Sequence, residues 1–169
     1  MTKALLIIAE QNFRDEELFE TKKEVEKKEI ITVIASKTSG EKTGSLGGKA
    51  KADIALKDVK PGDYNAIIFI GGAGARQYFN DFAALTIAKQ AYNKGKIVAA
   101  ICIAPVILAN AGILKNKKAT VWKSTDEIKI LKEKGAIYED KNVVVSGNII
   151  TACGPQASKE FGETIANLL

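Results

Sequence analysis

Residues 98–114 read VAAICIAPVILANAGIL, and this run of small apolar side chains decides how the fold is interpreted. Residues 96–102 predict a short strand that is buried on both faces, while residues 104–114 predict a helix. Cys102 lies at the junction, and its alanine neighbours leave room for an abrupt change of direction. The stretch therefore predicts a nucleophile elbow, in which sulfur takes the place of the usual hydroxyl oxygen.

Apolar runs alternate with amphipathic segments along the rest of the chain. The expected strands are 3–9, 30–36, 65–70, 96–102, 118–122 and a hairpin within 142–152, and the expected helices are 15–29, 80–95, 104–114, 124–135 and 156–169. The glycine-rich residues 39–63 predict a hairpin flap, with a strand at 52–56. Strands buried on both faces that alternate with helices predict a mainly parallel sheet between two helical layers. We expect one α/β domain over residues 1–169.

The absence of histidine is the most informative feature of the composition. Without an imidazole the chain has no Ser-His-Asp triad, no Cys-His pair and none of the usual zinc sites. The two cysteines, Cys102 and Cys153, have no CxxC spacing, so neither a metal site nor a structural disulfide is expected. Any catalysis must then depend on a thiol and on carboxyl groups.

The charge distribution argues against nucleic acid and membrane partners. The net charge is +5, but 23 of the 25 cations are lysines scattered among glutamates, and the two arginines, Arg14 and Arg76, are far apart in sequence. A nucleic-acid groove would need clustered arginines and interleaved aromatic residues. The apolar runs are too short to span a bilayer, and residues 1–13 lack a small-residue cleavage site, so we expect a cytoplasmic protein.

Two expected strand ends are suited to a site. Gly71 and Gly72 follow the strand at 65–70, and Cys102 ends the strand at 96–102. In a parallel sheet, ligands bind beyond the carboxyl ends of the strands, where helix N-termini present free N–H groups. A helix N-terminus would lower the pKa of Cys102 and favour the thiolate. The alternative is that Cys102 is a small buried hydrophobe.

Five segments together resemble the ThiJ/PfpI superfamily. They are ALLIIA with FRDEELFE, IIFIGGAGA, KIVAAICIAPVILANAGIL, KKATVW and NIITACGPQASKEFGETIANLL, and they cover nearly the whole chain. The resemblance implies a flavodoxin-like three-layer sandwich, a cysteine held in a strained conformation at the elbow, and assembly as a homodimer or higher homo-oligomer.

The resemblance also implies roles for individual residues. Cys102 matches the reactive cysteine of the family, and Glu17 matches the acidic residue that hydrogen-bonds it, with Glu16 as the competing alignment. Gly72 and Ile103 match the positions whose backbone N–H groups would hold an oxyanion.

The chain departs from the family pattern around the expected pocket. Ile103 stands where many members carry histidine, and Trp122 stands where some carry histidine or tyrosine. Ala152 and Cys153 replace polar or basic residues that line the pocket in the deglycase branch. We expect Trp122, Ala152 and Cys153 to line the pocket, Trp122 mainly as a packing residue and Cys153 as a core residue. Disulfide formation to an oxidised Cys102 is the alternative for Cys153.

These residues support several functions. We expect a cofactor-free enzyme in which Cys102 and Glu17 act on small reactive aldehydes or their adducts, as a glyoxalase or deglycase does. A redox sensor whose Cys102 is oxidised to sulfinate, without turnover, is the alternative, and a cysteine peptidase is the weakest. An inactive member of the family is also possible. The expected partner is thus a small carbonyl compound or an oxidant. A pocket with room for several carbon atoms would favour the enzyme over the sensor.

Overall fold

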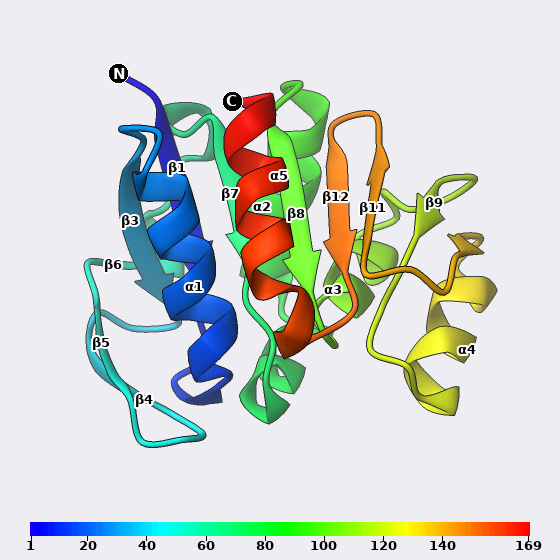
Figure 1. The fold of residues 1–169 in the computed structure, drawn as a ribbon, viewed down its shortest axis with the longest axis horizontal. Coiled ribbons are helices and arrows are strands. Elements are labelled where there is room, and N and C mark those ends of the chain that lie inside the picture. The colour runs from blue at the N-terminus through cyan, green and yellow to red at the C-terminus, as the bar shows by residue number, and fades with distance from the viewer.

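A seven-stranded sheet forms the centre of the computed structural model, which describes residues 1–169. Its order is β11-β12-β8-β7-β1-β3-β6, and every neighbouring pair is parallel except β11 and β12. The strands are β1 (Lys3–Ile7), β3 (Ile31–Ser36), β6 (Ile54–Ala55), β7 (Ala66–Phe69), β8 (Ile97–Ile101), β11 (Val143–Ser146) and β12 (Ile149–Ala152). The predicted mainly parallel α/β sheet and its terminal hairpin are therefore confirmed. The carboxyl ends of the parallel strands lie together along the lower edge in Figure 1.

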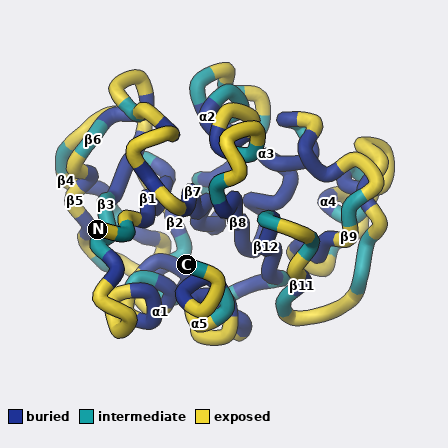
Figure 2. Tube along the Cα trace, turned by 90° about the horizontal axis from the view of Figure 1, so that it is seen from above, coloured by how far each residue is buried: buried dark blue, intermediate teal, exposed yellow.

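Helices cover both faces of this sheet. In Figure 1, α1 (Asp15–Glu26) and α5 (Ser158–Leu168) lie in front, and α2 (Phe82–Asn93) and α3 (Pro105–Asn110) lie behind. A hydrophobic core lies on each face of the sheet, and alternate residues of β1 pack into each. Leu5 belongs to the core on the α2 and α3 side, and Leu6 belongs to the core on the α1 and α5 side. Each such buried side chain stabilises the fold by about 2 kcal/mol. Figure 2 shows the buried strands between the partly exposed outer layers.

The remaining elements flank the sheet. Helix α4 (Thr125–Glu133) lies beside a two-stranded sheet of β9 (Lys118–Ala119) and β10 (Ile137–Tyr138), so the strand expected at 118–122 is shorter and lies outside the central sheet. Strand β10 has only two residues, too few for a periodic signal. No helix of the structure has both the length and the apolar character needed to cross a bilayer.

The helix expected at 104–114 ends early. Helix α3 has only six residues and stops at Asn110. Gly112 follows in the left-handed region, with φ +80°, which is typical of a helix terminator. Residues 102–104 form a turn, so the helix does not start beside Cys102.

The glycine-rich segment forms a hairpin, as predicted, but with different strands. Strands β4 (Gly40–Gly44) and β5 (Lys49–Ala52) pair antiparallel, and the short β2 (Gln11–Phe13) pairs with β4. The strand expected at 52–56 is correct only in part: β5 ends at Ala52, β6 covers Ile54 and Ala55 within the expected range, and a 3-10 turn follows from Leu56.

The buried carboxylate of Asp15 holds the tip of this hairpin. Its two oxygens accept hydrogen bonds from the N–H groups of Leu46 (2.9 Å) and Gly48 (2.7 Å). A side chain at Gly44 or Gly48 would overlap the carboxylate, so both positions need glycine. The hairpin tip is thereby fixed beside the carboxyl edge of the sheet.

Replacing Asp15 with alanine is expected to lower the free energy of unfolding by about 2 kcal/mol, because two hydrogen bonds to a charged group are lost. Urea unfolding measures this change, and hydrogen exchange at Leu46 and Gly48 should accelerate with it. Asp53→Ala is a useful comparison, because that carboxylate holds one backbone N–H group, of Ile34, away from the hairpin tip. Unchanged exchange at Leu46 in Asp15→Ala would contradict the role given to this carboxylate.

Candidate active site

The elbow holds Cys102 in a left-handed conformation, with φ +65°. This region is unfavourable for a residue with a side chain and costs on the order of 1 kcal/mol or more. Two backbone hydrogen bonds fix it: the Cys102 N–H donates to the Ala152 carbonyl (2.9 Å), and its carbonyl accepts from the Trp122 N–H (2.7 Å). The ends of β8 and β12 and the chain after β9 thus impose the conformation.

Glu17 is the carboxyl group that lies against this cysteine. It is fully buried on α1, and neither side-chain oxygen has a hydrogen-bond partner within bonding distance. A Cβ built on Gly71 would lie 2.6 Å from Cys102 Cβ and 2.7 Å from Glu17 Oε1, so both side chains press against this glycine. Glu16 instead forms a partly exposed ion pair with Arg14. Of the two glutamates that the sequence left open, the structure brings Glu17 to the cysteine.

Burial raises the pKa of Glu17 to about 8, although the positive charge of Arg14 opposes the shift. Glu17 is therefore largely protonated at pH 7. An acid that keeps its proton at neutral pH can donate a hydrogen bond as well as accept one. Its position beside the thiol makes Glu17 a group that can pass a proton at neutral pH.

Burial also raises the pKa of Cys102 to about 12, and the negative charge of ionised Glu17 contributes to the shift. Hydrogen bonds from the N–H groups of Gly72 and Ile103 and the charge of Arg14 act in the opposite direction. The prediction that a helix N-terminus lowers this pKa is wrong, because α3 starts only at Pro105 and burial dominates. Cys102 is thus a thiol at neutral pH, with two backbone donors facing its sulfur.

Gly72 can present its N–H only because it lacks a side chain. Its φ is +100°, and a Cβ there would lie 2.4 Å from the backbone nitrogen of Arg14. The Arg14 N–H in turn donates to the Gly71 carbonyl (2.9 Å), which joins the end of β7 to the start of α1. The two glycines that follow β7 therefore have separate functions: Gly71 leaves room for the side chains, and Gly72 supplies a donor.

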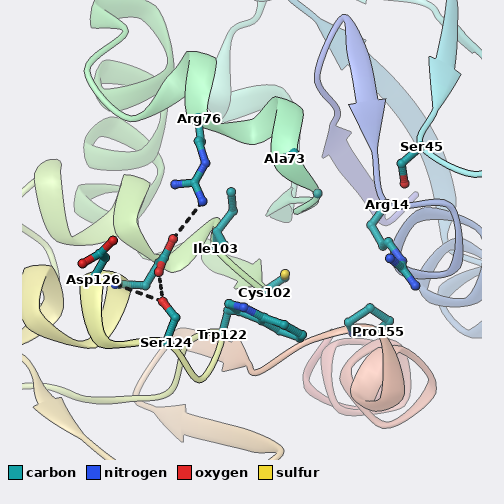
Figure 3. A pocket seen from close by; sticks show the side chains of 12 residues that line it. Arg14, Ser45, Ala73, Arg76, Cys102, Ile103, Trp122, Ser124, Asp126 and Pro155 are labelled. Atoms are coloured by element: carbon teal, nitrogen blue, oxygen red, sulfur yellow. Dashed lines mark hydrogen bonds and ion pairs between the residues drawn. The ribbon is translucent and has the colours of Figure 1, made fainter.

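A cavity of about 460 Å³ opens beside the sulfur (Figure 3). Its walls combine residues from the hairpin tip, the start of α1, the turn after β7, the elbow and α4. The lining residues are Arg14, Ser45, Gly72, Ala73, Arg76, Cys102, Ile103, Trp122, Ser124, Asp126, Glu127 and Pro155. The space is much larger than the roughly 30 Å³ that one water molecule occupies in the liquid.

Trp122 lies on the wall of this cavity, as Figure 3 shows, and is 42% exposed. The structure places Trp122 in the pocket, where the sequence also put it, and the packing expected of it is against Gly154 rather than inside the buried core. Its ring covers Gly154, where a Cβ would lie 3.0 Å from two ring carbons. Trp122 also borders a second cavity, of about 360 Å³, on its other side.

Ala152 and Cys153 do not line the cavity that contains Cys102. Ala152 is fully buried at the end of β12, beneath the elbow, where it accepts the Cys102 N–H. Cys153 is half-buried and lines the second cavity, with its sulfur 3.3 Å from Gln156 Nε2. The expectation that both line the pocket is wrong. Cys153 packs against the edge of the core on the α1 and α5 side but is only partly buried, so the expectation of a core residue holds in part.

Sequence reasoning missed the charged residues of the cavity. Arg14 precedes α1, Arg76 lies in the 3-10 segment Ala73–Tyr78, and Glu127 lies in α4. Arg76 Nη2 lies 3.1 Å from Glu127 Oε1, and Ser124 Oγ hydrogen-bonds the other oxygen of Glu127. The sequence offered one signal for the arginines: Arg14 and Arg76 are the only two arginines among 25 cations.

Comparison with known proteins agrees with this geometry. The DJ-1/PfpI family model matches residues 2–168. An uncharacterized protein of Methanocaldococcus jannaschii is 47% identical over 161 residues, which cover 95% of this chain and 78% of the relative. A deglycase of Thermococcus kodakarensis is 33% identical, covering 89% and 90% of the two chains.

The same likeness holds in three dimensions. The crystal structure of a ThiJ/PfpI domain protein from Brachyspira murdochii superposes with a TM-score of 0.94 at 35% identity, covering 98% of this chain and 95% of the other. Fold and sequence agree over nearly the full length, and the chain belongs to the DJ-1/PfpI family.

Proposed function

We propose that this protein is a cofactor-free enzyme that converts small reactive dicarbonyl compounds, or their adducts, into hydroxy acids. The observation that carries the proposal is the cavity of about 460 Å³ next to Cys102, which has room for a substrate of several carbon atoms. The deglycase name of a relative that is 33% identical supports the same class of reaction.

The first step is the addition of Cys102 to the aldehyde carbon. The Sγ–H bond breaks, an Sγ–C bond forms, and the proton moves to the aldehyde oxygen, which gives a hemithioacetal. Glu17, protonated at neutral pH, accepts the thiol proton at one oxygen and donates its own proton from the other. The N–H groups of Gly72 and Ile103 stabilise the negative charge that develops near the sulfur.

The remaining steps need only water. The proton on the former aldehyde carbon moves to the neighbouring carbonyl carbon through an enediol, again by way of Glu17, and a 2-hydroxy thioester results. Water then cleaves the thioester, which releases the hydroxy acid and restores the thiol. The dicarbonyl is oxidised at one carbon and reduced at the next, so no external oxidant or reductant is required.

Cys102→Ser is expected to abolish methylglyoxal turnover, because an alkoxide is far less accessible than a thiolate at pH 7. Lactate release measured in purified protein tests this expectation. Cys153→Ser provides the matched control, since its sulfur lies in the other cavity, and should retain full activity. Turnover unchanged in Cys102→Ser would remove the basis of the mechanism.

A redox sensor is the second candidate. The backbone N–H groups of Gly72 and Ile103 face the Cys102 sulfur and could stabilise a sulfinate formed there. Intact mass after mild peroxide treatment distinguishes the two functions. Selective oxidation of Cys102 without any dicarbonyl turnover would favour the sensor. A peptidase finds less support, because no imidazole is available to protonate a leaving amine.

The family resemblance also supports a proposal about assembly and location. We infer a homodimer or a higher homo-oligomer, which light scattering would test. A functional thiol that must stay reduced suits the cytoplasm, and cell fractionation would test that location.

A further inference from the structure

The fold gathers both arginines of the chain in one cavity. Arg14 and Arg76 are 62 positions apart in sequence, yet both line the space beside Cys102, whereas none of the 23 lysines does. Figure 3 shows their guanidinium groups on different walls, with the sulfur between the two walls. A planar guanidinium matches carboxylate and phosphate groups in a way that an ammonium group cannot.

Both guanidinium groups are held in place before any ligand arrives. Arg14 contacts the two oxygens of Glu16, at 2.6 Å from Nε and 3.2 Å from Nη2. Arg76 is held by Glu127, whose other oxygen is bonded to Ser124. Because the side chains are already oriented, less conformational entropy is lost when they bind a ligand.

Each guanidinium keeps N–H donors free for a ligand. An arginine has five N–H donors, of which Arg14 uses two and Arg76 uses one in these ion pairs. Both side chains remain accessible, at 37% and 60% exposure. Four acidic groups lie near the cavity. The arginines neutralise Glu16 and Glu127, the raised pKa of Glu17 keeps it largely protonated at pH 7, and the exposed Asp126 forms no ion pair.

We propose that Arg14 and Arg76 form a subsite for an anionic head group of the carboxylate or phosphate type, which the substrate of Cys102 carries at the end away from its reactive carbonyl. That this ligand is a substrate rests on the proposed function, whereas the anion subsite does not. The reaction would then act on anionic dicarbonyl compounds in preference to neutral ones such as methylglyoxal.

Alkylation of Cys102 tests the subsite without any turnover. Iodoacetate and iodoacetamide are nearly the same size and differ in charge. In a Cys153→Ser background, the rate ratio of iodoacetate to iodoacetamide is compared with the same ratio for glutathione. One arginine–carboxylate contact of ordinary strength should raise the ratio about tenfold over that of glutathione.

Substitutions assign the effect to residues. Arg14→Met and Arg76→Met should each lower the ratio, and the double variant should bring it to the value of glutathione. Lys123→Met is the matched control, since it removes one positive charge from a side chain that lines the neighbouring cavities, and its ratio should not change. A ratio equal to that of glutathione in the unsubstituted background, or one that the double variant leaves unchanged, would overturn the proposal.

Competition distinguishes the two head groups. Protection of Cys102 by acetate identifies a carboxylate subsite, protection by inorganic phosphate identifies a phosphate subsite, and protection by neither refutes both. If dicarbonyl turnover is absent but the iodoacetate preference depends on the arginines, the subsite stands and the proposed reaction is wrong. If methylglyoxal is turned over but the iodoacetate preference is absent, the proposed reaction stands and the anion subsite is wrong.

Discussion

Glu17→Gln is expected to make the protein more stable than the wild type at alkaline pH, with a growing difference between pH 5 and pH 9. The folded chain holds the Glu17 proton up to a pKa of about 8, whereas the ordinary value is 4.5. Below pH 4.5 both states are protonated and the carboxyl adds no penalty. As the pH rises, the unfolded chain releases the proton first, so folding stability falls until the folded pKa is passed.

The size of this effect follows from the two values. The interval from 4.5 to about 8 corresponds to ~5 kcal/mol of stability lost above pH 8. Glutamine cannot ionise, so its variant should not show this loss. Urea unfolding at pH 5, 7 and 9 measures the difference, and Glu16→Gln is the control because that carboxyl is partly exposed. If the free energy of unfolding depends on pH in the same way in wild type and Glu17→Gln, the pKa of Glu17 is not raised in the folded state.

Gly71→Ala is expected to destabilise the fold by about 3 kcal/mol and to abolish activity, because the methyl group has no space. Its carbon would lie 2.6 Å from Cys102 Cβ, 2.7 Å from Glu17 Oε1 and 2.7 Å from the Ile101 carbonyl oxygen. The strand end, the elbow and α1 hold these atoms, so relief requires movement of the backbone. The separation of acid and thiol would change with it.

Thermal and urea unfolding give the stability change, and the lactate assay gives the activity. Gly62→Ala is the matched control, because its nearest neighbour would be the flexible Lys94 side chain at 3.9 Å. We expect that variant to stay within about 0.5 kcal/mol of the wild type. An active and stable Gly71→Ala protein would mean that the elbow is more adaptable than this packing implies.

The sequence was sufficient to predict the sheet and its helical layers. The apolar runs that became β1, β7 and β8 are buried on both faces, and this pattern is specific to parallel strands between helices. The N-caps are also residue types that favour this position: Asp81 caps α2 and Ser124 caps α4. The strand expected at 52–56 was drawn with the wrong bounds, because alternation over a few small residues does not define where a strand starts and ends.

The site was harder to predict because it depends on distances between elements. Local spacing placed Cys102 at an elbow, but the direction of its pKa shift depends on burial from all sides. Arg14 and Arg76 appeared unrelated because only the folded sheet brings the start of α1 and the turn after β7 together. Trp122 and Cys153 are of residue types that favour burial, yet Trp122 is 42% exposed and Cys153 is only partly buried.

The position of Trp122 gives the protein an intrinsic optical probe. It is the only tryptophan in the chain, and its indole borders both the cavity that contains Cys102 and the cavity that contains Cys153. Indole emission responds to the polarity of its surroundings, so a molecule that displaces water from either space will change the fluorescence. Ligand occupancy can therefore be followed by titration in the unlabelled wild-type chain, and the chemical step can be timed separately from binding.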